Sequence, residues 1–154
     1  MIVWRLCRAK RRSEAFTGEG ARLAGGRWNP KGTPVVYTAE SLALAAIELF
    51  VHLDPAELAA AYVSFPVSVP GDLPIQRVDV KTLPRNWRDT PAPPELARIG
   101  RQWVDGAQTA ILQAPSAVVP QESVLVLNPA HPDFARIQVG KAQPFEFDPR
   151  FRKS

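Results

Sequence analysis

The sequence predicts a single domain of the α+β class, with a central mixed or antiparallel sheet and helices on its flank. Three observations lead to this expectation. With 154 residues, the chain has the length of one domain that can bury a core. Short apolar or alternating segments, typical of strands, recur between turn residues. Sixteen prolines interrupt long elements, so that only about three helices are expected.

The first third of the chain predicts strand, loop, strand and helix. Residues 3–7 (VWRLC) are apolar except for Arg5 and predict the first strand. Residues 8–32 are rich in glycine and charge and predict a loop with local turns. A short strand with β-branched residues is expected at 34–37. Thr38 is then expected to cap a helix over 42–53.

The remaining elements are shorter and separated by proline-rich turns. A second helix after Asp54 is expected at 55–61, and a third at 94–106, where apolar residues recur at helical spacing. Strands are expected at 62–69, 75–80, 110–112, 123–127 and 144–147. The domain is expected to span residues 1–154 and to end in a basic tail from about 149.

Composition indicates an ordinary globular protein, with 45% hydrophobic and 22% charged residues. The net charge of +4 includes basic clusters at 5–12 and 150–153. These clusters could bind nucleic acid or could simply be exposed to solvent. The second interpretation is favoured, because no aromatic residues alternate with the basic ones to stack on bases.

The cysteine, the histidines and the hydropathy of the sequence exclude further classes of protein. Cys7 is the only cysteine and predicts a buried apolar residue, with neither a disulfide nor a cysteine-based zinc site. The two histidines have no metal-binding spacing, so no metal is expected. The N-terminal order of apolar before basic residues does not fit a secretory signal, and no apolar run approaches a membrane span; a cytoplasmic protein without membrane contact is expected.

Glu48 is the most unusual residue of the sequence. It lies near the middle of the almost wholly apolar helix expected at 42–53 (LALAAIELFVHL). An ionised carboxylate in apolar surroundings is costly unless something pairs with it. His52 follows at i+4 and could be that partner. The pattern alone leaves a structural ion pair and a functional carboxylate equally open.

Four further residues are weak candidates when each is considered alone. Arg27 follows two glycines and offers a planar set of donors for phosphate, although a surface arginine is more common. Trp28 is more often a core residue than a stacking platform. Tyr37 is expected to be a half-buried tyrosine on a strand. Ser116 lacks the Gly-x-Ser-x-Gly context of hydrolases and is expected to be a turn residue.

Taken together, the motifs resemble those of a known family, the RES domain toxins of bacterial toxin–antitoxin pairs. The resemblance rests on GGRWN at 25–29, VYTAES at 36–41, Glu48 with His52, PSAVVP at 115–120, NPAHP at 128–132 and FEFDPR at 145–150. These blocks occur in the order of the family and span nearly the whole chain.

The resemblance implies a fold like that of the ADP-ribosyltransferases and an enzyme that destroys cellular NAD⁺ by hydrolysis or phosphorolysis. It implies Arg27, Tyr37, Glu48 and Ser116 as active-site residues. NAD⁺ would be a substrate and not a cofactor, and inorganic phosphate a possible co-substrate.

The expected roles follow from residue chemistry. Glu48 would stabilise the positive charge that develops on the ribose, and Arg27 would bind the pyrophosphate. Tyr37 would stack on the nicotinamide ring or offer its hydroxyl to the ribose, and Trp28 is counted among the residues that bind NAD⁺. Ser116 would hydrogen-bond the nicotinamide side or the acceptor without becoming a covalent nucleophile.

The resemblance also implies a partner, an antitoxin with a helix-turn-helix part that blocks the cleft. The assembly would be a hetero-oligomer that meets DNA only through the antitoxin.

Two alternative functions remain at this point. One is an ADP-ribosyltransferase that modifies a protein or nucleic acid, and the other is a basic RNA-binding or RNA-cleaving module.

Overall fold

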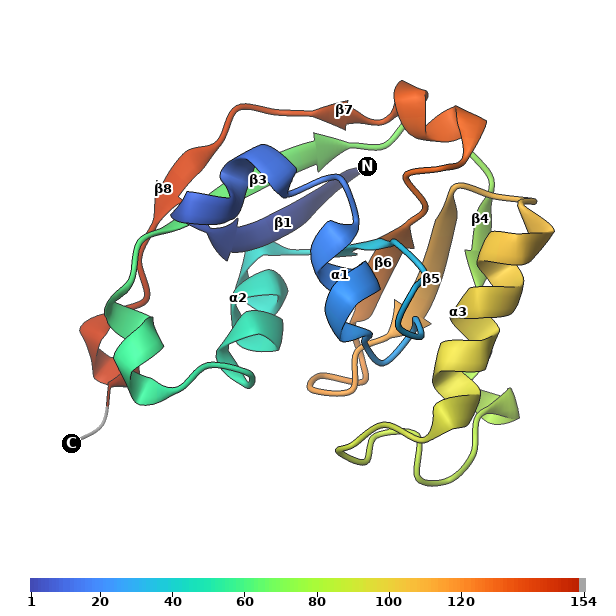
Figure 1. Cartoon of the computed structure of the whole chain (residues 1–154), viewed down its shortest axis with the longest axis horizontal. Helices are drawn as coiled ribbons and strands as arrows, with labels where there is room; N and C mark the ends of the chain where they lie inside the picture. The colour runs from blue at the N-terminus through green and yellow to red at the C-terminus, as the bar shows by residue number, and fades with distance from the viewer. Residues whose placement is uncertain (153–154) are drawn as a thin grey trace.

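The two longest strands, β1 (Ile2–Arg8) and β3 (Tyr62–Ser68), pair antiparallel along their whole length in the computed structural model, which describes residues 1–152 (Figure 1). The sheet continues from them in the order β4-β5-β6-β2-β1-β3-β7, and β8 pairs with β3 beside β7. The other strands are β2 (Val36–Ala39), β4 (Ile75–Arg77), β5 (Ile111–Pro115), β6 (Ser123–Leu127), β7 (Gln138–Val139) and β8 (Gln143–Phe145). All pairs are antiparallel except β4 with β5, so the mixed sheet of the predicted α+β fold is confirmed.

The side chains of β1 alternate between two cores, as strand geometry requires. Val3 and Cys7 belong to the core on one face, which confirms the expected burial of Cys7. Leu6 lies on the opposite face and packs with Leu44 of α2 (Leu42–Phe50). On that face α2 packs against β1 and β2.

The helix α3 (Pro94–Gly106) covers the other end of the sheet (Figure 1). Leu96 and Trp103 are buried against Leu112 of β5 and Val126 of β6. This is the face that the helical spacing of apolar residues predicted, and both ends of the helix agree with the sequence-based expectation. Pro94 begins the helix, a position where its missing N–H is not needed.

Three predictions near α2 were wrong in detail. Thr38 does not cap the helix; it lies within β2, and its hydroxyl donates to the carbonyl of Leu125. Ser41 is the N-cap, and its Oγ accepts from the amide of Leu44 at 3.0 Å. The strand runs two residues later than expected because pairing with β6 extends it to Ala39. The helix ends at Phe50, so the expected range of 42–53 was too long.

Several short elements also differ from expectation. Residues 8–32 are not all loop: they contain α1 (Glu19–Ala24), in which the Arg22 guanidinium binds the Glu19 carboxylate. The helix expected at 55–61 is a 3₁₀ turn, Pro55–Ala59. The two-residue strand β7 was not expected, since so short a strand has no readable alternation.

The basic tail begins as an ordered turn. Pro149–Phe151 form a 3₁₀ turn, and the Phe151 ring lies 5.1 Å from the ring of Phe50 on α2. Lys153 and the last residue of the expected tail lie outside the described residues. Among the helices of residues 1–152, none combines the length and the apolar character needed to cross a membrane.

Candidate active site

Glu48 and Ser116 meet directly, although 68 residues separate them in the sequence. The Ser116 hydroxyl donates to Glu48 Oε1 at 2.5 Å. Glu48 lies on the last turn of α2, and Ser116 follows β5. The carboxylate is therefore held by the turn after β5 as well as by its own helix.

The hydroxyl of Ser116 is fully engaged. It accepts from the amides of Val118 at 3.1 Å and Val119 at 2.9 Å while it donates to Glu48. A serine hydroxyl has one donor and two acceptor positions, so none is left. The residue is also 1% exposed. Ser116 thus positions Glu48 and has no hydrogen-bond position left, so its expected direct contact with the substrate or acceptor is not supported by its bonding in the structure.

The second oxygen of Glu48 is available to a ligand. The described part of the chain offers hydrogen bonds to Oε1 only, and the side chain is half-buried. The expected pairing with His52 is not present in residues 1–152, where Glu48 forms no ion pair. The helix ends at Phe50, so His52 lies beyond it, on an exposed turn. The i+4 rule does not apply past a helix end.

Tyr37 organises the loop that carries Arg27. Its hydroxyl donates to Asn29 Oδ1 at 2.6 Å and accepts from the amide of Trp28 at 3.1 Å. A Cβ at Gly26 would lie 2.7 Å from this hydroxyl, so only glycine allows the close approach. Tyr37 is half-buried, as expected, and burial raises the pKa of its hydroxyl well above the ordinary value. It therefore stays protonated and keeps donating.

Asn29 is a site residue that sequence reasoning did not single out. Its side chain is 1% exposed, and its amide nitrogen donates to the carbonyls of Ala21 and Thr33 at 2.9 and 3.1 Å. It thereby joins α1, the loop and Tyr37 in one network. The signal in the sequence was its place in GGRWN, but an asparagine after a glycine turn is common, so spacing alone could not identify it.

The Trp28 side chain lies in the core and not in the site. It is 2% exposed and packs with Trp87 and Trp103. Its carbonyl lies against α3 at Gly100, where a Cβ would come within 1.6 Å of the oxygen. The expected substrate contact of Trp28 is therefore not supported by its position. Trp28 instead fixes the loop to α3, and only its amide reaches Tyr37.

Arg27 extends from this loop toward the segment 84–91. Its Nη1 donates to the carbonyls of Trp87 at 2.7 Å and Asp89 at 3.0 Å. Partial burial lowers the pKa of Arg27, while the nearby Glu48 and Asp89 charges act in the opposite direction. An arginine remains charged after such a shift. The structure thus brings Arg27, Tyr37, Glu48 and Ser116 into one region without a direct ion pair between Arg27 and Glu48.

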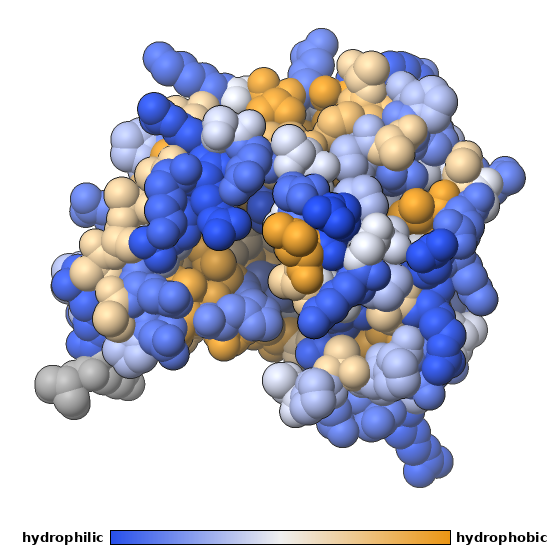
Figure 2. Space-filling model, viewed as in Figure 1, coloured by the Kyte–Doolittle hydropathy of each residue, from blue (hydrophilic) through white to orange (hydrophobic). Residues whose placement is uncertain are grey.

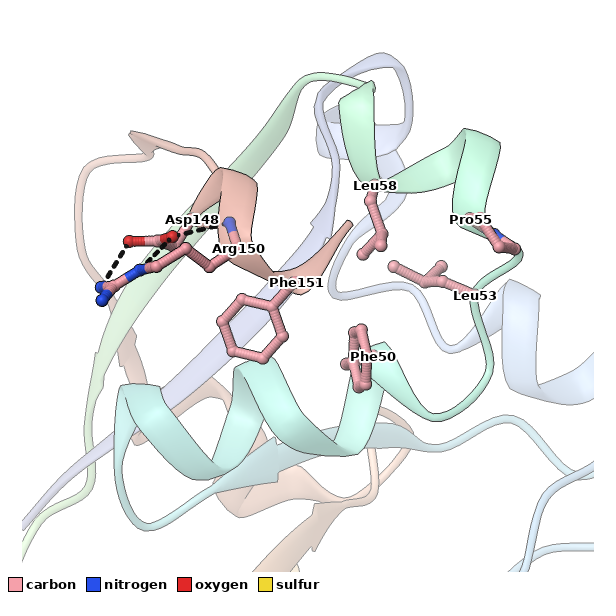
Figure 3. A pocket seen from close by; sticks show the side chains of 7 residues that line it. All are labelled: Phe50, Leu53, Pro55, Leu58, Asp148, Arg150 and Phe151. Atoms are coloured by element: carbon pink, nitrogen blue, oxygen red, sulfur yellow. Dashed lines mark hydrogen bonds and ion pairs between the residues drawn. The ribbon is translucent and has the colours of Figure 1, made fainter. Parts of the chain in front are cut away.

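The surface view shows an indentation at its lower edge, with hydrophobic side chains on the floor and hydrophilic ones around it (Figure 2). A hollow of about 820 Å³ lies beside the end of α2, and its lining residues include none of Arg27, Tyr37, Glu48 and Ser116 (Figure 3). Its walls include Phe50, Leu58 and Phe151, and the charged residues that line it within residues 1–152 are Asp148 and Arg150, which pair with each other. The volume of a hollow therefore does not identify the candidate site. The site is identified by the polar side chains of Arg27, Tyr37, Glu48 and Ser116, which lie in one region.

Removal of the Tyr37 hydroxyl is expected to loosen the loop. Tyr37→Phe leaves the Trp28 amide and Asn29 Oδ1 without their partner, which should lower the free energy of unfolding by about 1–3 kcal/mol. Urea denaturation measures this. Tyr62→Phe is the matched control: it removes one bond to the Glu57 carbonyl, far from Arg27, and should cost less. Equal losses in the two variants would contradict the role assigned to Tyr37.

Comparison with known proteins gives consistent results. A family model described as RES domain matches residues 2–148. A protein of Sphingobium sp., named Prs ADP-ribosylating toxin, is 38% identical over 152 residues, which are 96% of this chain and 94% of that protein. The protein Toxin Res of Photorhabdus laumondii is 37% identical over 156 residues, covering 100% of this chain and 99% of the relative.

A solved structure has the same fold. The chain is similar to one in the M. tuberculosis MbcT–MbcA toxin–antitoxin complex, with a TM-score of 0.78 and 21% identity. The match covers 94% of this chain and 84% of that one. At this level of identity the likeness speaks for the fold alone.

Proposed function

The chain belongs to the RES domain family, and on that premise we propose that it is the toxin of a toxin–antitoxin pair and an enzyme that cleaves the bond between nicotinamide and ribose in NAD⁺. The observation that carries the proposal is the carboxylate of Glu48, which Ser116 holds through one oxygen while the other has no protein partner in residues 1–152.

The chemistry needs a negative charge near the sugar. When the glycosidic bond of NAD⁺ breaks, its electron pair leaves with the nicotinamide nitrogen, which becomes neutral, so no general acid is required. The remaining ribose carries positive charge, and a fixed carboxylate stabilises the transition state more than the substrate. Glu48 Oε2 would accept a hydrogen bond from a ribose hydroxyl, which strengthens as that charge develops.

Arg27 supplies the opposite charge that a dinucleotide needs. Its Nη1 is fixed by two carbonyls, and its remaining N–H groups have no partner in the described part of the chain. A guanidinium held in this way suits the oxygens of a pyrophosphate. Positive and negative side chains that do not neutralise each other fit a ligand with a phosphate end and a cationic sugar end.

The acceptor of the ADP-ribosyl group is water, phosphate or a macromolecule. The attacking oxygen forms the new bond to ribose C1 and releases its proton. Water gives ADP-ribose and phosphate gives ADP-ribose 1″-phosphate. Transfer to a protein is the second candidate function, because the Sphingobium relative is named an ADP-ribosylating toxin. All three routes use the same Glu48 and Arg27.

We also infer a partner antitoxin that covers the site. The MbcT–MbcA structure is a toxin–antitoxin complex, which supports a partner of this kind for a chain of the same fold. A helix-turn-helix part in the antitoxin would bring the hetero-oligomer to DNA. The toxin itself would then need no DNA contact.

Product analysis tests the proposed function. Purified protein without antitoxin is incubated with NAD⁺, with and without inorganic phosphate and with a cell extract, and the products are separated by chromatography. We expect nicotinamide release equal to the loss of NAD⁺, and the second product identifies the acceptor. When the ADP-ribose part of the NAD⁺ carries a label, label retained on a protein of the extract would favour the transferase. Unchanged NAD⁺ under all three conditions would refute the proposal.

A further inference from the structure

The segment 84–91, which lies outside the sequence blocks that carry the family resemblance, connects the two loops of the candidate site. Its carbonyls at Trp87 and Asp89 accept from Arg27, as described above. Between them, Arg88 Nε donates to the carbonyl of Ala117 at 2.9 Å, one residue from Ser116. The Trp87 side chain is buried in the core under α3 and anchors the segment.

Arg88 presents a fixed positive charge beside the Ser116 turn. The residue is exposed, and the hydrogen bond to Ala117 uses Nε alone. In residues 1–152 its two terminal nitrogens have no hydrogen-bond or ion-pair partner, and the adjacent Asp89 carboxylate does not pair with it. Holding the side chain through Nε reduces the entropy lost when a ligand orders it.

The two arginines complement each other. Arg27 reaches the segment from the 25–29 loop, and Arg88 reaches from the segment to the 116–122 turn. Both keep terminal N–H groups in the geometry that binds phosphate oxygens bidentately. A pyrophosphate carries two adjacent anionic groups, so it can engage two such cations at once.

We propose that Arg88 is a second phosphate-binding residue, which together with Arg27 holds the pyrophosphate of the dinucleotide. This inference rests on the proposed function, because it takes NAD⁺ as the ligand. The segment 84–91 then has two roles in the site, since it fixes Arg27 through its carbonyls and contributes a cation of its own.

Two variants separate charge from hydrogen bonding. Arg88→Gln keeps an N–H that can reach the Ala117 carbonyl but loses the charge, whereas Arg88→Lys keeps the charge but not the donor at the Nε position. If the charge binds phosphate, Arg88→Gln should raise KM for NAD⁺ and the Kd of ADP-ribose about tenfold with little change in kcat. Arg88→Lys should stay within about threefold of the wild type.

Arg85→Gln serves as the control, since Arg85 is an exposed arginine of the same segment whose side chain has no hydrogen bond or ion pair within residues 1–152. It should bind ADP-ribose as the wild type does. An active Arg88→Gln variant with unchanged Kd would overturn the inference, and an impaired Arg88→Lys beside a normal Arg88→Gln would show that Arg88 only positions the Ser116 turn.

The same experiment separates a failure of this inference from a failure of the proposed function. If the wild type binds ADP-ribose and releases nicotinamide while Arg88→Gln equals it in KM, only the role of Arg88 fails. If the wild type neither binds ADP-ribose nor cleaves NAD⁺, the proposed function and the role of Arg88 fail together.

Discussion

Replacement of Glu48 by glutamine is expected to lower kcat for NAD⁺ cleavage about a thousandfold and to leave the fold intact. The carboxamide has nearly the same shape, and its oxygen can still accept the Ser116 hydroxyl. What it loses is the negative charge opposite the developing positive charge of the ribose. Loss of one such electrostatic group in an enzyme site costs roughly 10²–10³ in rate.

The measurement is nicotinamide release, combined with NAD⁺ binding and circular dichroism. Glu48→Gln should bind NAD⁺ within about threefold of the wild type, because the charge acts mainly in the transition state. Glu40→Gln is the matched control: Glu40 is exposed, lies just before α2 and makes no side-chain hydrogen bond in residues 1–152. If Glu48→Gln cleaved NAD⁺ at the wild-type rate, Glu48 would have no role in the mechanism.

The largest effect on stability is expected at Gly100. A Cβ there would lie 1.6 Å from the carbonyl oxygen of Trp28, and both partners are backbone-fixed, so no side-chain rotation can relieve the contact. Gly100→Ala must separate α3 from the 25–29 loop. Overpacking of this kind costs about 3 kcal/mol or more, despite the better helix propensity of alanine. Because Arg27 is on that loop, activity should fall as well.

Urea denaturation of Gly100→Ala and Gly106→Ala tests this contact. Gly106 lies at the end of the same helix, and a Cβ there meets nothing within 4 Å. Alanine at that position should leave the free energy of unfolding unchanged or raise it by about 0.5–1 kcal/mol. A Gly100→Ala midpoint equal to that of Gly106→Ala would mean that the loop and helix are not in tight contact.

Local pattern predicted those elements whose residues themselves carry the signal. The α3 helix has proline at its start and apolar residues at helical spacing, and β6 is a short apolar run between turns. The α1 helix was missed because its six residues include a glycine and no buried side chain. Short helices of this kind depend on their neighbours for stability.

The site shows the same division between local and long-range information. The apolar surroundings of Glu48 were visible in the sequence, but the partner that a local rule offered, His52, lies past the helix end. The actual partner, Ser116, is brought in by the sheet order, which places β6 next to β2 and β5 next to β6. Only the family resemblance had joined the two residues. No sequence motif predicted the contact of Gly100 with Trp28, because this contact depends on the distance between two backbone segments.

The most direct test of the central claim is a crystal structure of Glu48→Gln with NAD⁺ bound. We predict that the ribose next to nicotinamide lies within hydrogen-bonding distance, about 3 Å, of residue 48, and that the pyrophosphate lies against Arg27. A dinucleotide seated instead in the hollow between Phe50 and Phe151, remote from residue 48, would contradict the account.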